Sequence, residues 1–341
     1  MPSNSAAWYV AKNTKPLEIR AAPYTSPGAN EIVIKNGALG INPADYGMQE
    51  NELWPLIYPT ILGEDVAGEV VEVGSAVSRF HKGDRVVGYA LGLTTKRDCE
   101  SAFQAYTVLT EGMTSHIPDF LPFERAAVLP LTLSTASNGL FSDGYLRLPY
   151  PTVHPKPTGK ALLVWGGATC VGSCGMQLAI AAGYEVITTA SPKNFDYVKK
   201  LGAARVFDYH SATIVEELIE ALKGKVIAGA LDCIGIQGVF ESCVQVVSKS
   251  EGKKFIATVR LPIPENLPHG IEAKFVMCSD IVHDGVGKAV FVDYLPKALA
   301  EGKFIAAPDP QVVGKGLESV QAALDVVKRG MSAKKAVVVL E

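Results

Sequence analysis

The stretch ALLVWGGATCVGSCGMQLAIAA (residues 161–182) decides the fold. It begins with an apolar run, passes through glycines and small residues, and continues with a segment of helical length that Gly183 ends. This order predicts a buried strand, a tight turn and a helix. In a dinucleotide-binding fold, small residues at such a turn let the backbone approach a pyrophosphate, and the helix N-terminus supplies N–H groups.

The glycines of this turn follow a degenerate form of a known pattern. Gly167, Thr169 and Gly172 occupy the three positions of G-x-G-x-x-G, so threonine replaces the middle glycine. The setting between an apolar strand and a helix favours phosphate binding. The residues predicted to hold the pyrophosphate are Gly166, Gly167, Ala168, Thr169, Cys170, Val171 and Gly172. The alternative is a tight turn that packs well and binds nothing.

The alternation of strand and helix continues after this turn. Further strands are predicted at 185–191, 204–209, 228–235 and 253–259, and further helices at 194–202, 213–224 and 238–247. Strands that are apolar throughout and alternate with helices predict an α/β fold with a doubly wound parallel sheet. Ligands of such sheets lie at the carboxyl ends of the strands. We therefore expect cofactor contacts from Ile234, Gly235, Thr258 and Val259, whose apolar neighbours would be part of the core in either case.

The end of the second strand favours one nicotinamide cofactor. An NAD site has an Asp or Glu about 20 residues beyond the glycines, to bind the ribose 2′-hydroxyl. The matching stretch, VITTASPKN (186–194), contains no acid. The residues predicted to bind a 2′-phosphate are Ser191, Lys193, Asn194 and Tyr209. They favour NADP(H), and the alternative is a solvated loop with an ordinary surface lysine.

The first part of the chain has a different sequence pattern. Short Val-rich segments broken by glycine predict a barrel-like all-β unit over residues 1–125. The nucleotide-binding domain is expected at 126–280, and residues 281–341 are expected to return to the first domain.

Composition excludes several classes of protein. The 341 residues are 48% hydrophobic and carry 32 Lys plus Arg against 35 Asp plus Glu, a net charge of −3. Wholesale disorder is therefore excluded, and nucleic acid is not expected as a partner. The six cysteines form no CxxC pair and no disulfide framework, and no apolar run is long enough to cross a membrane. We expect a cytoplasmic protein.

Five segments in fixed order resemble the medium-chain dehydrogenase/reductase superfamily over essentially the whole chain. They are GINPADY (40–46), ILGEDVAGEVVEVG (61–74), FHKGDRVVG (80–88), AAVLPLTLSTA (126–136) and GGATCVG (166–172). The resemblance implies a GroES-like β-barrel domain joined to a Rossmann domain that binds a nicotinamide cofactor. More narrowly, SPKNF (191–195) with VFDY (206–209) looks like the fungal branch that contains trans-acting enoyl reductases of polyketide pathways.

The resemblance also implies that the metal sites of the zinc-dependent relatives are lost. Their catalytic ligands match Asn42, Glu64 with Asp65, and about Leu131 here, and their structural-zinc lobe, GLTTKRDCESAFQ (92–104), keeps only Cys99. Too few donors remain for a zinc site with one open position, so we expect no metal. Alcohol oxidation without a Lewis acid is disfavoured, whereas reduction of an activated C=C bond or a quinone stays feasible.

Candidate catalytic residues follow from the same likeness. Related enzymes often carry Lys or Tyr at the position of Gly47, so Tyr46 is the candidate proton donor, with an aromatic wall residue and proton supply from solvent as the alternatives. Thr132 resembles a hydroxyl that contacts the nicotinamide, or it is a helix N-cap. Asn42 and Pro43 resemble a loop that lines the cofactor cleft, or they form a turn.

The sequence thus predicts a zinc-independent, NADPH-dependent reductase of enones, enoyl compounds or quinones, acting on a small molecule. Two other functions stay open: a trans-acting enoyl reductase that works on thioesters bound to the carrier protein of a polyketide synthase, and a non-catalytic NADPH-binding protein. The oligomeric state, monomer or homodimer, is also open.

Overall fold

The computed structural model describes residues 2–51 and 53–340, which form two compact units. Unit 1 contains the chain up to Leu131, the short segment Leu299–Glu301, and the chain from Ala306 onward. Unit 2 contains Thr132–Ala298 and Gly302–Ile305. Unit 1 has two sheets and unit 2 has one, and each unit has its own apolar core.

Unit 1 is built on two sheets of mostly antiparallel strands. The larger sheet has the order β16-β17-β3-β5-β6-β8, with β7 paired to β3, and the smaller has the order β2-β1-β4. The strands are β1 (Asn4–Tyr9), β2 (Glu18–Ala22), β3 (Glu31–Gly40), β4 (Thr60–Ile61), β5 (Asp65–Val73), β6 (Arg85–Tyr89), β7 (Tyr106–Thr110), β8 (Thr114–His116), β16 (Asp309–Lys315) and β17 (Lys334–Val339). Its short helices are α1 (Pro43–Asn51), α2 (Gly92–Thr95), α3 (Phe123–Ala126) and α10 (Val320–Lys328), with 3₁₀ turns at η1 (Asp98–Glu100), η2 (Glu111–Met113) and η6 (Leu317–Ser319).

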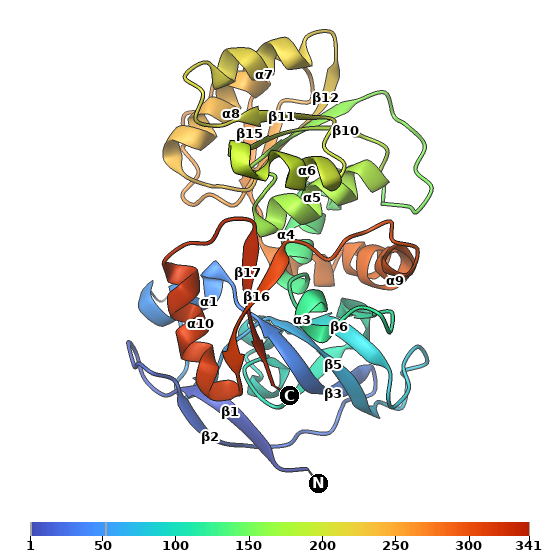
Figure 1. Cartoon of the computed structure of the whole chain (residues 1–341), viewed down its shortest axis with the longest axis vertical. Coiled ribbons are helices and arrows are strands. Elements are labelled where there is room, and N and C mark those ends of the chain that lie inside the picture. The colour runs from blue at the N-terminus through green and yellow to red at the C-terminus, as the bar shows by residue number, and fades with distance from the viewer. Residues whose placement is uncertain (1, 52, 341) are drawn as a thin grey trace. The chain divides into compact units, whose positions relative to one another are not determined.

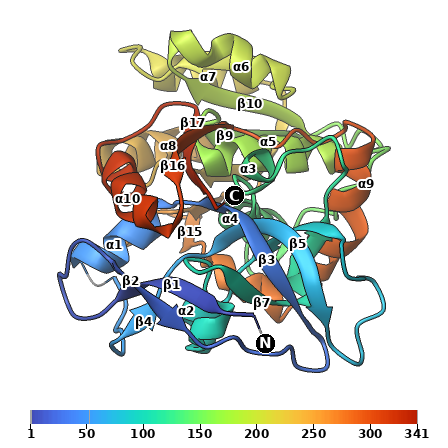
Figure 2. The ribbon, with the colours of Figure 1, turned by 60° about the horizontal axis from the view of Figure 1, so that its bottom comes forward.

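The C-terminal segment completes unit 1. Strand β17 pairs antiparallel with β3, so the red end of the chain lies beside a blue strand in Figure 1. Helix α10 packs beside α1 (Figure 2), where Gln321 and Gln49 exchange hydrogen bonds. The apolar residues of β17, Ala336 and Val338, join the same core as Ile32 and Ile34 of β3. The last strand is therefore part of the core and not an appendage.

Unit 2 holds the parallel sheet that the sequence predicts. The order is β11-β10-β9-β12-β14-β15, with β13 paired to β12, and all of these pairings are parallel. The strands are β9 (Ala161–Trp165), β10 (Glu185–Ala190), β11 (Arg205–Asp208), β12 (Val226–Asp232), β13 (Glu251–Gly252), β14 (Phe255–Thr258) and β15 (Glu272–Phe275). The helices are α5 (Cys170–Ala181), α6 (Phe195–Lys200), α7 (Ile214–Leu222) and α8 (Gln237–Lys249), with 3₁₀ turns at η3 (Pro192–Asn194) and η4 (Cys278–Val282) and a π-helical segment at η5 (Lys288–Tyr294).

Helices cover both faces of this sheet. Ala230 of β12 belongs to the core that α7 and α8 build with the strands. Its neighbour Leu231 points to the other face, since a Cβ placed on Gly175 of α5 would meet the Leu231 side chain at 2.5 Å. Alternate residues of one strand thus serve two helix layers, which confirms the doubly wound fold class.

Two segments pack with a different unit from the one that the sequence predicts. Residues 126–131 belong to unit 1, because the Leu131 N–H and the Val128 carbonyl both bond to side chains there. Residues 281–298 belong to unit 2, where the ring of Tyr294 packs edge-on against Phe304. Helix α4 (Pro130–Phe141) begins in unit 1 and continues in unit 2, and helix α9 (Leu295–Ala300) begins in unit 2 and ends in unit 1.

The described residues also contain elements that the sequence pattern did not predict, notably α1 and the edge strand β15. The six cysteines are free thiols. Within residues 2–51 and 53–340, every helix is too short or too polar to span a bilayer.

Candidate cofactor site and the buried acidic cluster

The turn between β9 and α5 is tightly packed and requires its glycines. A Cβ on Gly172 would lie 2.2 Å from the carbonyl oxygen of Gly166, so no other residue fits there without moving the turn. Gly166 has a φ of +86°, a conformation that side chains disfavour. The residue that replaces the middle glycine, Thr169, is the N-cap of α5, and its hydroxyl accepts the Gly172 N–H at 2.9 Å.

The surface of this turn is open. Ala168, Thr169, Cys170 and Val171 are partly exposed, whereas the glycines before and after them are buried. The first intrahelical bond of α5 runs from the Ser173 N–H to the Thr169 carbonyl, so the N-terminal end of a twelve-residue helix faces this surface. An anion is stabilised at such an end by N–H groups and by the helix dipole.

The residues predicted to bind a 2′-phosphate follow the adjacent strand β10. Ser191 is buried and accepts a hydrogen bond from the Asn194 amide at 3.2 Å, and Lys193 is exposed. In the register of the sheet, Asp208 at the end of β11 stands opposite Ala190. Its carboxylate accepts bonds from the His210 N–H and the His210 ring, and these contacts lower the pKa of Asp208.

Tyr209 lies just beyond, on the surface. It is 44% exposed, and its ring packs on that of His210 with the centroids 4.0 Å apart. The acid beside Tyr209, Asp208, lies on the third strand of the unit and not in the stretch where the sequence pattern predicts an NAD-binding acid.

The ends of β12 and β14 bring the remaining cofactor candidates together. Ile234 and Gly235 lie two and three residues beyond the end of β12. Thr258 is the last residue of the neighbouring strand β14, and Val259 follows it. The side chain of Ile234 reaches the phosphate turn, since a Cβ on Gly166 would meet it at 2.7 Å. Three strand ends of unit 2 thus converge on one edge of the sheet.

Thr132 lies in the first turn of α4, after Pro130, so it is not the N-cap of that helix. It is 3% exposed, and its hydroxyl lies 3.6 Å from the Cys174 thiol on α5. Its predicted contact with the nicotinamide stays a prediction.

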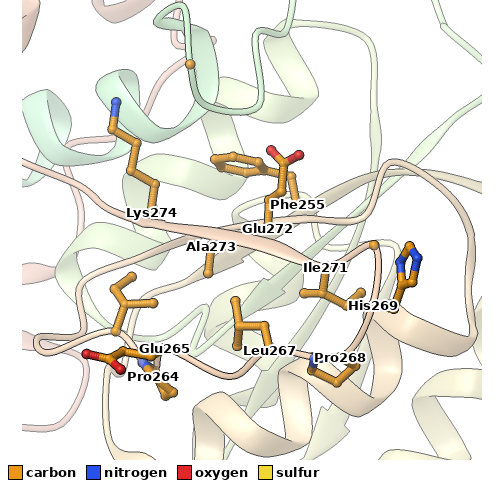
Figure 3. Close-up of a pocket in the computed structure, with 13 residues that line it drawn as sticks. Phe255, Pro264, Glu265, Leu267, Pro268, His269, Ile271, Glu272, Ala273 and Lys274 are labelled. Carbon is orange, nitrogen blue, oxygen red and sulfur yellow. The ribbon is translucent and has the colours of Figure 1, made fainter.

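A hollow of about 550 Å³ lies elsewhere in unit 2 (Figure 3). It runs along the edge strand β15 and the loop before it, and Lys274, Glu272 and His269 are among its lining residues. None of the predicted cofactor residues lines it.

In unit 1, the positions that match zinc ligands in the relatives form a hydrogen-bonded network. Asp65 is completely buried and bonds to Lys335, which is 2% exposed. The same carboxylate accepts the Asn42 amide at 2.9 Å and the Leu131 N–H at 2.5 Å. The Asn42 amide and the Leu131 backbone are therefore committed to holding Asp65.

Two further buried acids adjoin this network. Asp45 accepts the Asn42 N–H at 2.7 Å, and Glu64 accepts the Tyr89 hydroxyl at 2.8 Å. Burial, together with the neighbouring carboxylates, raises the pKa of Asp45 to about 7 and that of Glu64 to about 8. One lysine thus faces three carboxyl groups in a low-dielectric site, and two of the three hold their protons more tightly than usual.

This cluster does not suit a catalytic zinc ion. No group of three His, Cys, Asp or Glu side chains among the described residues has the arrangement of a metal site. The ammonium group of Lys335 already bonds to the Asp65 oxygen Oδ2, and Leu131 has only an alkyl side chain. Zinc prefers thiolate and imidazole ligands, which are missing at these positions.

Tyr46 and Pro43 have different surroundings. Tyr46, on α1, is partly buried and packs against the apolar core of unit 1. Pro43 is exposed, whereas Asn42 beside it is completely buried. The proton-donor role of Tyr46 stays a prediction.

Comparisons with known proteins identify the class. Residues 28–122 match the model of the alcohol dehydrogenase GroES-like domain, and residues 170–271 match that of the zinc-binding dehydrogenases. The chain belongs to the medium-chain dehydrogenase/reductase superfamily and is an oxidoreductase that uses a nicotinamide cofactor.

Individual sequence relatives and solved structures are also similar to this chain. The chain is 50% identical to dehydrogenase pigH of Monascus ruber across the full length of both proteins. It is 41% identical to trans-enoyl reductase himH of Aspergillus japonicus, over 98% of this chain and 97% of that one. The crystal structure of an alcohol dehydrogenase superfamily protein from Novosphingobium aromaticivorans has the same fold, with a TM-score of 0.82 at 22% identity, over 99% of this chain and all of that one.

The geometry of unit 2 fits the cofactor that the family implies. The glycine cradle at 166–172, the helix end beside it and the converging strand ends provide the features of a dinucleotide site. When bound, the reduced nicotinamide supplies a hydride.

Proposed function

We propose that this protein is a zinc-independent, NADPH-dependent reductase of activated C=C bonds, with quinones as a second acceptor class. The observation that carries the proposal is the contrast between two sites. In the glycine turn of unit 2, residues 168–171 are partly exposed at a helix N-terminus, whereas in the acidic cluster of unit 1 Asp65 bonds to Lys335 and Asn42. The first supports dinucleotide binding, and the second leaves no donor set for a Lewis acid.

The choice of NADPH rests on the end of β10. Ser191 and Asn194 offer a hydroxyl and an amide, and the exposed Lys193 offers a cation to a 2′-phosphate. Asp208 stands opposite Ala190 in the sheet register, and its carboxylate already accepts hydrogen bonds from the His210 N–H and the His210 ring.

The chain's own residues then have defined tasks. The turn at 166–172 binds the pyrophosphate, and the loops after β12 and β14 orient the nicotinamide half. Thr132 donates a hydrogen bond at the reacting end, and Tyr46 or solvent supplies the proton that ends on the α-carbon. The negative charge that develops on the substrate carbonyl oxygen requires hydrogen-bond donors in a site from which water is excluded.

The trans-enoyl reductase relatives favour one substrate form within this class. Two of them, himH and tndF, are 41% and 33% identical to this chain over nearly its whole length. We therefore propose a thioester of an α,β-unsaturated acid, presented by the carrier protein of a synthase in the cytosol, as the physiological substrate.

The test is a substrate panel with purified protein. We expect NADPH to be oxidised much faster than NADH, with enoyl thioesters reduced faster than free enones or quinones. Tight NADPH binding without turnover of any acceptor would favour the non-catalytic alternative. Equal rates with free enones and thioesters would count against a carrier-bound substrate.

A further inference from the structure

A buried carboxylate lies where this fold directs a dinucleotide. Asp232 is the last residue of β12, and it is completely buried. The sheet order β10-β9-β12-β14 means that the chain winds outward in both directions from the boundary between β9 and β12. In open parallel sheets, the ligand lies outside the carboxyl ends of the strands at this switch point.

The carboxylate of Asp232 holds two strand ends together. One oxygen, Oδ1, accepts the backbone N–H groups of Ile234 at 3.0 Å and Gly235 at 3.2 Å. The other, Oδ2, accepts the hydroxyl of Thr258 at 2.7 Å, across the β12–β14 pairing. A single side chain therefore fixes three of the four residues that are expected to contact the nicotinamide half.

The network extends past these three residues. The Thr258 hydroxyl in turn accepts the Arg260 N–H at 3.0 Å, so the loop after β14 is tied to the same carboxylate. The loop after β12 turns sharply at Gly235, whose φ is +70°, and carries Ile234 against the phosphate turn. These bonds set the shape of both loops at the switch point.

The Asp232 side chain acts only as an acceptor in this network. The hydrogen bonds to Asp232 come from two backbone N–H groups and one hydroxyl. In an Asp232→Asn variant the amide group would replace one acceptor oxygen, and either Thr258 or a loop N–H would face a donor instead of an acceptor. An unsatisfied buried donor costs free energy and changes the local backbone.

We propose that Asp232 is a positioning residue that shapes the ledge formed by residues 233–235 and 258–259 for the nicotinamide half of the cofactor. The inference rests on the proposed NADPH function. Asp232 acts through Ile234, Gly235 and Thr258 and makes no direct contact with substrate. The residues for the 2′-phosphate, by contrast, follow β10 and β11.

The test compares two probes, NADPH and adenosine 2′,5′-bisphosphate, which carries the adenine half alone. For Asp232→Asn we expect NADPH to bind roughly tenfold more weakly, because one charge-assisted bond is lost. The affinity for the bisphosphate is expected to stay at the wild-type value. The exposed Asp143→Asn, in the same unit, is the matched control and should change neither affinity.

A second variant covers the case in which Asp232→Asn does not fold. Thr258→Val removes the hydroxyl donor and should show the same selective loss for NADPH, and Thr258→Ser should recover most of it. Equal weakening of both probes, or unchanged binding of NADPH, would overturn the proposal. Wild-type protein that binds neither probe would instead refute the NADPH function itself.

Discussion

The two units bury carboxylates in opposite ways. Asp65 in unit 1 has a lysine partner, Lys335, and lies in a cluster that includes two further acids, Asp45 and Glu64. Asp232 in unit 2 is held by two backbone N–H groups and a hydroxyl. The first arrangement ties distant segments of unit 1 together, and the second shapes loops at a ligand edge. The same residue type thus serves stability in one unit and positioning in the other.

The largest effect that this comparison predicts concerns Lys335. Lys335→Met removes the cation from a buried carboxylate cluster, and we expect unfolding free energy to fall by about 3–5 kcal/mol. Chemical denaturation measures it. Lys334→Met is the matched control, because the Lys334–Asp309 pair is about half exposed, and we expect a change below about 0.5 kcal/mol. A similar small loss for both variants would show that Lys335 does not neutralise the cluster.

The next effect concerns the phosphate turn. In Gly172→Ala the new Cβ would lie 2.2 Å from the Gly166 carbonyl oxygen, so the turn must shift. We expect NADPH affinity to fall by roughly 30- to 100-fold, about 2–3 kcal/mol, in calorimetric titration. Gly238→Ala, on α8, is the control, because its Cβ would meet no atom within 4 Å. Unchanged NADPH binding in Gly172→Ala would place the pyrophosphate elsewhere.

A smaller effect is expected at the end of β10. Lys193→Ala should weaken NADPH binding by roughly tenfold, about 1.4 kcal/mol, and leave NADH binding unchanged. Lys199→Ala, an exposed lysine on α6, is the control. If Lys193→Ala weakens the binding of NADPH and NADH equally, Lys193 does not bind the 2′-phosphate.

The acidic cluster predicts a pH dependence of stability. The pKa of Glu64 is raised from 4.5 to about 8 in the folded protein, so the folded state binds this proton more tightly than the unfolded state does. Stability should therefore fall as the pH rises from about 4.5 to about 8. Glu64→Gln mimics the protonated acid. In this variant the loss of unfolding free energy over this pH range should be smaller than in wild type by on the order of 1 kcal/mol.

The measurement is the midpoint of chemical denaturation of wild type and variant at several pH values, from about pH 5 to about pH 9. Glu220→Gln, at an exposed position on α7, is the control and should follow the wild-type curve. A Glu64→Gln curve that runs parallel to wild type would mean that this carboxyl is ionised in the folded protein at neutral pH.

The smallest expected effect is that of a chelator. Because Asn42, Lys335 and Leu131 leave no zinc donor set around Asp65, exhaustive chelation should leave the rate of NADPH oxidation unchanged. A loss of activity that added zinc restores would show that the cluster rearranges to bind metal.

Local sequence was enough to predict the parallel-sheet unit. The strand, turn and helix at 161–182 lie within two residues of their predicted bounds, and the later strands follow the same apolar pattern. These elements depend on short-range signals, namely apolar runs, glycines and helix ends. The edge strand β15 was missed because its residues, EAKF, alternate in exposure and carry two charges.

The acidic cluster could not be predicted in this way. Asp65 and Lys335 are 270 positions apart, and no local pattern pairs them. The sequence did show that zinc ligands are replaced at Asn42 and Glu64, but it did not show which residues hold the remaining acid. For Asp232 a signal existed: a lone acid at the end of the apolar run AGALD (228–232), at the edge where ligands bind.

The central claim is that this protein transfers a hydride from NADPH to a conjugated acceptor without a metal ion. The most direct test is a single turnover with NADPH deuterated at C4 and an enoyl thioester, in the presence of a chelator, with the product analysed by mass spectrometry. The account predicts one deuterium on the β-carbon of a saturated thioester. Recovery of unreacted thioester beside bound NADPH, or turnover that begins only when zinc is added, would contradict it.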